Sequence, residues 1–156
     1  FCCPHDIQLM PDGKTLVVAN GGIQTHPNSG RKKLNLKTMA SNLTYIDIES
    51  GNKIESVSVA ESKASIRHLS ITEEGSVIVA MQFQREIANH NRTVPLGGIH
   101  KPGAAFALFP APDTVISRMK DYAGSVTYNN KTGIAGFTSP KGNIAVFWNV
   151  HTLELR

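Results

Sequence analysis

The chain has 156 residues, of which 40% are hydrophobic and 18% are charged. This length and composition predict one globular domain with a buried core and exclude a disordered segment. The net charge at pH 7 is only +4, and the basic residues form no recognisable nucleic-acid-binding motif. We therefore expect no nucleic-acid partner.

Cys2 and Cys3 are the only cysteines, and they are adjacent. Ring strain disfavours a disulfide between neighbours, and the spacing fits no zinc motif, so a disulfide scaffold is excluded. No apolar run approaches the ~20 residues that a membrane span needs. The chain starts at Phe1, so the lack of a signal peptide says nothing about export.

An internal repeat organises the chain. The segment HDIQLMPDGKTLVVAN (5–20) aligns without gaps with RHLSITEEGSVIVAMQ (67–82), at an offset of 62 residues. Each segment predicts a strand of alternating polar and apolar residues, a turn that contains Gly, and a second, nearly all-apolar strand. A weaker third copy covers 125–139.

Further strands are predicted after each hairpin. In the first copy they are 43–48 and 53–59, and in the later copies the third strands are 104–109 and 143–148. Long insertions, 21–42 and 84–103, separate the second strand from the third in the first two copies. Between the second and third copies, 113–122 predicts a short linker helix with Asp113 as its cap.

These units are typical of propeller blades. We expect an all-β fold, a β-propeller fragment of about three four-stranded antiparallel blades with one short linker helix. The single partial domain would comprise blade one at about 5–60, blade two at about 67–112, the helix at about 113–122 and blade three at about 125–156. Three blades leave two open sheet faces, which must be covered by missing sequence, by a second copy of the chain in self-association, or by misassembly. Tyr45, Phe147 and Trp148 are expected to pack between blades.

Four stretches resemble a bacterial family, domain of unknown function 1513: PHDIQLMPDGKTLVVANGGIQTHPNSGRKKLNL, SIRHLSI, YAGSV and FTSPKGNIAVFW. The resemblance covers nearly the whole chain and implies a seven-bladed propeller, of which this chain has less than half the length. It also implies export to the periplasm and an association with imelysin-like proteins linked to iron uptake. It implies no catalytic residue.

Polar residues fall at equivalent strand ends, on the face of the blades where the long insertions emerge. We call this face the mouth. The candidate ligand-binding residues there are His5, Asp6, Asn20, Arg67, His68, Gln82, Ser125 and Ser139.

Three interpretations of these residues remain open. His5, Arg67 and His68 could clamp an anion, or His5, Asp6 and His68 could bind a metal. The structural alternative, which we favour, is that such residues hydrogen-bond neighbouring blades together. Because one His per blade is poor evidence for tight coordination, we assign no metal ligand and expect no cofactor.

The insertions add a basic rim that is expected to attract an anionic partner. Its candidate residues are Arg31, Lys32, Lys33, Arg92 and Lys101. His26, His90, His100 and His151 lack metal spacing and are interpreted as surface residues. Gly21-Gly22 and Gly97-Gly98 precede no helix, so we interpret them as turns rather than phosphate loops.

Ser125 and Ser139 lack the strand-to-helix turn of a nucleophile elbow, so no catalytic residue is assigned. The sequence therefore predicts a non-catalytic binding or scaffold propeller whose partner is an unknown protein or a small anionic ligand. Two alternatives remain: a metal-binding or enzymatic propeller that uses His5, Asp6 and His68, and a fragment without independent activity.

Overall fold

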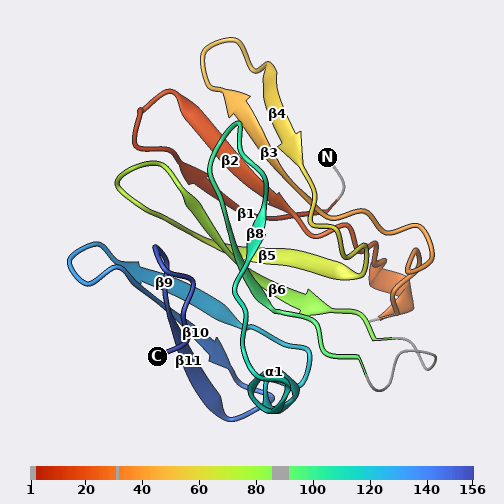
Figure 1. Cartoon of the computed structure of the whole chain (residues 1–156). Helices are drawn as coiled ribbons and strands as arrows, with labels where there is room; N and C mark the ends of the chain where they lie inside the picture. The colour runs from red at the N-terminus through yellow and green to blue at the C-terminus, as the bar shows by residue number, and fades with distance from the viewer. Residues whose placement is uncertain (1–2, 31, 86–91) are drawn as a thin grey trace.

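The computed structural model describes residues 3–30, 32–85 and 92–156. In this part of the chain the strands form three antiparallel sheets (Figure 1). A short α-helix lies between the second sheet and the third, and a 3-10 turn lies in the connection between the second and third strands of the first sheet. This confirms the all-β fold class. None of the described helices is long and apolar enough to cross a membrane.

The three sheets follow one another along the chain, and we call them blades one, two and three. Blade one contains β1 (Pro4–Leu9), β2 (Thr15–Asn20), β3 (Asn42–Asp47) and β4 (Lys53–Val57). Blade two contains β5 (Ala64–Ile71), β6 (Val77–Phe83), β7 (Gly97–His100) and β8 (Ala107–Leu108). Blade three contains β9 (Ser125–Asn129), β10 (Ile134–Ser139) and β11 (Ile144–Asn149), and α1 (Asp113–Arg118) precedes it.

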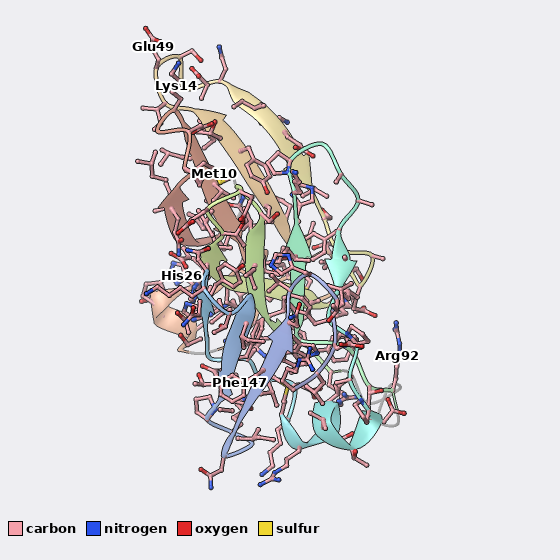
Figure 2. All side chains as sticks on the ribbon, turned by 60° about the vertical axis from the view of Figure 1, so that its left-hand side comes forward. Met10, Lys14, His26, Glu49, Arg92 and Phe147 are labelled. Atoms are coloured by element: carbon pink, nitrogen blue, oxygen red, sulfur yellow. The ribbon has the colours of Figure 1, made fainter. Side chains whose placement is uncertain are left out.

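The blades fan out with their first strands side by side, because β1 contacts β5 and β5 contacts β9. Figure 1 shows the hairpin turns of the three blades on one side and the long connections after β2 and β6 on the other. In Figure 2, Lys14 and Glu49 mark the hairpin end, far from Arg92. Equivalent strand ends therefore lie on a common side, as the repeat predicts.

Two core clusters hold the fan together, and β6 contributes to both. Val77, Val79 and Met81 pack in the cluster with blade one, whereas Ile78 and Ala80 pack in the cluster with blade three. Both faces of β6 are therefore buried, which explains why its residues do not alternate and why 77–81 are all hydrophobic.

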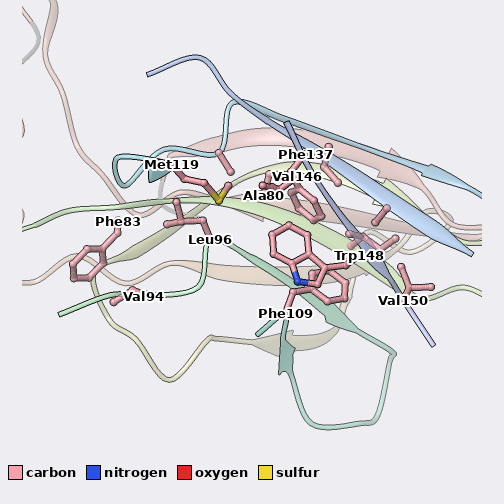
Figure 3. Packing of buried hydrophobic residues seen from close by; sticks show 14 residues of the cluster. Ala80, Phe83, Val94, Leu96, Phe109, Met119, Phe137, Val146, Trp148 and Val150 are labelled. Carbon is pink, nitrogen blue, oxygen red and sulfur yellow. The ribbon is translucent and has the colours of Figure 1, made fainter. Parts of the chain in front are cut away.

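The second cluster contains an aromatic group (Figure 3). The ring of Phe109 stacks on Trp148 at a centroid distance of 5.7 Å, and Phe137 meets Trp148 edge-on at 5.2 Å. The indole nitrogen of Trp148 donates to the carbonyl of Pro110, 2.7 Å away. The interface between blades two and three is therefore closely packed and its polar group is satisfied.

The outer faces of blades one and three are open in the described part of the chain. Ile7 of β1 is 56% exposed, whereas Leu69 and Val126, at the equivalent positions of β5 and β9, are 4% and 9% exposed. Phe147 of β11 is 46% exposed, whereas Tyr45, its equivalent in β3, is 1% exposed (Figure 2). The inter-blade packing predicted for Tyr45 and Trp148 is confirmed, and the packing predicted for Phe147 is not observed.

The predicted third strand of blade two was placed wrongly. β7 begins at Gly97 and ends at His100, and the predicted strand at 104–109 contains β8, the fourth strand. Gly97-Gly98 is therefore part of a strand rather than a turn. A Cβ at Gly97 would lie 3.0 Å from the ring of Phe137, and one at Gly98 would lie 2.5 Å from the ring of Phe106. Glycine is needed here because aromatic rings pack directly on the backbone.

The linker helix is shorter than predicted. α1 ends at Arg118, and Lys120 and Asp121 then adopt left-handed φ angles of 49° and 57°. Asp113 lies inside the helix instead of capping it, and its carboxylate accepts a hydrogen bond from the hydroxyl of Thr93. The helix does pack against the core of blades two and three, as expected, because Val115 contacts that cluster and Met119, the C-cap, belongs to it.

The ungapped repeat match is one residue out of register after the turn. Leu9 pairs with Leu16 across the first hairpin, whereas Ile71 pairs with Val77 across the second, which is one residue shorter. The equivalent of Asn20 is therefore Met81, not Gln82. Residues before the turn keep the predicted equivalence.

Candidate functional site

His5 and Arg67 occupy equivalent β-bulges at the mouth ends of their strands. The pairing of β1 with β2 shifts between Pro4 and Asp6, and the pairing of β5 with β6 shifts between Ile66 and His68. A bulge leaves its extra residue outside the ladder and turns the side chain in a new direction. The repeat thus brings a His and an Arg to matching positions at the mouth.

Three side chains of β1 tie blade one to blade two. Asp6 accepts a hydrogen bond from the backbone nitrogen of Leu69, at 2.9 Å. Gln8 donates to the carbonyl of Leu69 at 2.7 Å, and Nδ1 of His5 lies 2.8 Å from the carbonyl of Arg67. Hydrogen bonds between neighbouring blades are what we expect if these strand-end residues have a structural role.

Arg67 differs from its neighbours, because its guanidinium has no hydrogen-bond or ion-pair partner among the described residues. Its Nε is buried and unsatisfied, although the side chain as a whole is only partly buried. Burial lowers the pKa of Arg67, and electrostatic interactions with Tyr122 and Cys3 partly oppose that shift. Arginine remains protonated in proteins, so Arg67 is a desolvated positive charge.

Two lysines lie near Arg67. Lys33, from the connection between β2 and β3, donates from Nζ to Oε1 of Gln84. Lys141, from the turn between β10 and β11, places Nζ 4.8 Å from the centre of the Tyr122 ring. Partial burial of the Lys33 ammonium lowers its pKa, and the charges of Lys141 and Arg67 lower it further.

Sequence analysis missed Lys141, Tyr122 and Gln84 as members of this group. A signal was present for Lys141, because it follows Ser139, the equivalent of Asn20, at the point where the long connections begin in the other two blades. No comparable signal marks Tyr122, which is brought to the mouth by its isolated bridge with Gln82.

His5 and His68 lie together beside this group. Their ring centroids are 4.8 Å apart, with the planes nearly perpendicular. Burial and the charge of Arg67 lower the pKa of His5. The described residues contain no group of three or more His, Cys, Asp or Glu that could hold a metal ion.

The other candidate residues are scattered. Asn20 is fully buried, although it lies on the open face of blade one. Its amide donates to Asn42 and Thr44, and its Oδ1 has no partner among the described residues. Ser139 is buried and donates to the carbonyl of Met119 at 2.7 Å. Ser125 is exposed at the start of β9, and Gln82 bridges to Tyr122.

The predicted basic rim is only partly formed. Lys101 lies in the turn between β7 and β8, beside Asp12 and Glu73, so it belongs to the hairpin end and not to the mouth. Arg92 is neutralised by Glu61, 2.7 Å away. Lys32 is exposed in the first connection, and Lys33 is exposed as a whole residue although its ammonium group is partly buried. Arg31 is outside the described residues.

One of the four histidines predicted at the surface is buried. His100 has no exposed area and lies between Tyr45 and Phe106. The prediction failed because residue 100 was assigned to a loop, whereas it ends strand β7. His26 and His151 are exposed as predicted, and His90 is outside the described residues.

The protein is a propeller-like array of blades with a polar, positively charged mouth. The chain belongs to the family described as protein of unknown function DUF1513, whose model matches residues 2–156. A comparison with curated proteins gives no significant match.

Solved structures share the fold at low identity. A chain described as "Structure of U3-55K" is 12% identical, with a TM-score of 0.63, and the match covers 99% of this chain and 38% of that one. Hydrazine synthase of Kuenenia stuttgartiensis is 19% identical, with a TM-score of 0.61, over 92% of this chain and 39% of that one. This chain therefore spans about two fifths of each of these two structures.

Proposed function

We propose that this protein is a non-catalytic binding propeller that recognises an anionic small molecule or an anionic partner protein at its mouth. The observation that carries the proposal is Arg67, a desolvated cation whose Nε has no partner among the described residues. A buried donor without a partner is costly, and an anionic ligand would remove that cost.

The hydroxyl groups near the mouth support a binding role. Ser65 donates to the carbonyl of Gly21 at 2.7 Å, and Ser139 donates to the carbonyl of Met119 at the same distance. A serine nucleophile needs a general base within hydrogen-bond reach. These two hydroxyls bind backbone oxygens, which is typical of a scaffold.

Thermal unfolding in the presence of small molecules tests the proposal. We expect anionic compounds to raise the unfolding midpoint more than sodium chloride does at equal ionic strength, and neutral or cationic compounds to have no such effect. Arg67→Gln should abolish the effect. Lys14→Gln, at the hairpin end, should retain it. An equal response of wild type and Arg67→Gln to every anion would refute the proposal.

A metal-binding function is the second candidate, and the arrangement of His5 favours it. A neutral His5 that donates from Nδ1 to the Arg67 carbonyl presents a lone pair on Nε2, next to His68. Titration with Zn²⁺ and Fe²⁺ against the His5→Ala/His68→Ala double variant separates the two functions. Equal affinity in both proteins would exclude this site.

The family resemblance supplies the remaining parts of the proposal. On that basis the protein works in the periplasm, in association with imelysin-like proteins, within a ring of seven blades. The open faces around Ile7 and Phe147 would then pack against further blades, and the 156-residue chain alone would self-associate. Sedimentation of the chain and of Phe147→Lys, together with fractionation of producing cells, tests these points.

A further inference from the structure

The mouth gathers one positive charge from each blade. Lys33 comes from the connection of blade one, Arg67 from the inner strand of blade two, and Lys141 from the short turn of blade three. We infer that Arg67, Lys33 and Lys141 form a subsite for an oxyanion with at least two negative charges, such as a phosphate or a polycarboxylate. This inference rests on the proposed anion-binding function.

Arg67 provides the directional part of the subsite. Its guanidinium presents five N–H donors in a planar fork that matches two oxygens of a carboxylate or phosphate. Its Nε is buried without a partner among the described residues, and the bulge in β5 fixes where the side chain leaves the strand. The position from which the group reaches the mouth is therefore set before any ligand arrives.

The two lysines are held in place with donors to spare. Nζ of Lys33 uses one donor on Gln84, and Nζ of Lys141 lies over the ring of Tyr122. An ammonium group has three donors, so each lysine can still bind an oxygen atom. Neither contact neutralises the positive charge.

The carboxylates nearby are already engaged. Asp121 binds Arg85 through two contacts of 2.6 and 2.7 Å, and Glu61 binds Arg92. Asp6 accepts hydrogen bonds from backbone nitrogens. Burial lowers the pKa of Lys33, and the like charges of Lys141 and Arg67 lower it further, with no acidic group among the described residues opposing them.

The uncompensated charge selects the ligand class. A monoanion would leave two of the three cations unpaired, whereas a dianion or trianion offsets most of their mutual repulsion. Coulomb energy at a partly desolvated site is several times larger than in bulk water, so this difference is measurable. Phosphate and citrate both carry the required charge, and they represent the two kinds of ligand named above, a phosphate and a polycarboxylate.

Calorimetric titration at fixed ionic strength tests the inference, with inorganic phosphate, citrate and acetate as probes. We expect phosphate or citrate to bind at least about tenfold more tightly than acetate, because their additional negative charge can also pair with the two lysines. The tighter binder of the two shows whether the site prefers a phosphate or a polycarboxylate. Arg67→Gln and Lys141→Gln should each weaken that binding about tenfold, and Lys14→Gln should not change it. Lys141 is exposed, so its variant is expected to fold even if Arg67→Gln does not.

A second readout follows Lys33 directly. Binding of a dianion should raise the pKa of the Lys33 ammonium, which heteronuclear NMR measures. Equal affinity for acetate and the multivalent anions would overturn the subsite but leave the proposed function standing. Binding that survives both substitutions would place the anion elsewhere and also overturn it. If no anion binds at all, both proposals fail.

Discussion

The hydroxyl of Tyr45 in blade one lies 2.7 Å from Nδ1 of His100 in blade two, inside the core. Nε2 of the same ring lies 3.1 Å from the carbonyl of Ala104, which can only accept, so Nε2 carries the proton and Nδ1 accepts from Tyr45. Two blades are thus joined by a buried hydrogen bond between side chains from different sheets.

Tyr45→Phe should destabilise the protein by about 1–3 kcal/mol, because Nδ1 of His100 would remain buried without a donor. Chemical denaturation with wild type as reference measures the change. The matched control is Tyr128→Phe, at a partly exposed ring in β9, which should cost less. Equal losses in the two variants would show that the Tyr45 hydrogen bond contributes nothing specific.

Stability should decrease as the pH falls below about 6.5, the ordinary pKa of His. Burial lowers the pKa of His100 in the folded protein, although Glu55 and the Ala104 carbonyl act in the opposite direction. The unfolded chain therefore binds more protons in the window between the lowered pKa and 6.5, so acid favours unfolding there. Urea titrations at several pH values should show this slope.

The pH dependence of the free energy of unfolding should be weaker in His100→Gln. Other groups face the ring, namely Tyr45 and Glu55, whose Oε1 is 3.6 Å from Nε2. The pKa of His5 is also lowered, so His5→Gln should remove a separate part of the slope. An unchanged slope in His100→Gln would mean that this residue does not titrate with unfolding.

Asp6→Ala should destabilise the contact between blades one and two by about 1–3 kcal/mol, because the backbone nitrogen of Leu69 loses its acceptor. Asp6→Asn keeps an oxygen acceptor and should recover part of the loss. Asp12→Ala serves as a comparison, since Asp12 accepts only from Lys14 and Thr15 within one hairpin. Identical denaturation midpoints for Asp6→Ala and wild type would contradict the assignment.

Gly97→Ala should be strongly destabilising, because the new methyl group would meet the buried rings of Phe137 and Phe109 at 3.0 and 3.1 Å. Gly136→Ala is the matched control in β10. Its methyl group would meet Phe147 at 3.1 Å, but that ring is 46% exposed and can turn away. The unfolding midpoints of the two variants should differ clearly. A neutral Gly97→Ala would show that the aromatic packing is looser than described.

The repeat was sufficient to predict most strands, because alternation and apolar runs report burial directly. β1, β2, β3, β5, β6 and β10 all overlap predicted strands, although each of them extends past the predicted bounds at one end or both. β7 was missed because its sequence, Gly-Gly-Ile-His, carries turn signals. Its glycines are required by Phe106, just before β8, and by Phe137 of β10, and such contacts leave no local pattern.

The candidate site was only partly predictable for a related reason. His5 and Arg67 follow from the repeat, since both are bulge residues at equivalent positions. The assignment of Lys101 to the mouth failed because it depended on the end of β7. Tyr122 and Gln84 are positioned by tertiary contacts alone.

Because β6 supplies side chains to both core clusters, neither interface can separate without exposing part of this strand. The three sheets should consequently unfold in one cooperative step rather than one after another, and native-state hydrogen exchange should be slowest at the amides of β6. Cooperativity of the array thus depends on its middle sheet, with the outer two acting as its shielding layers.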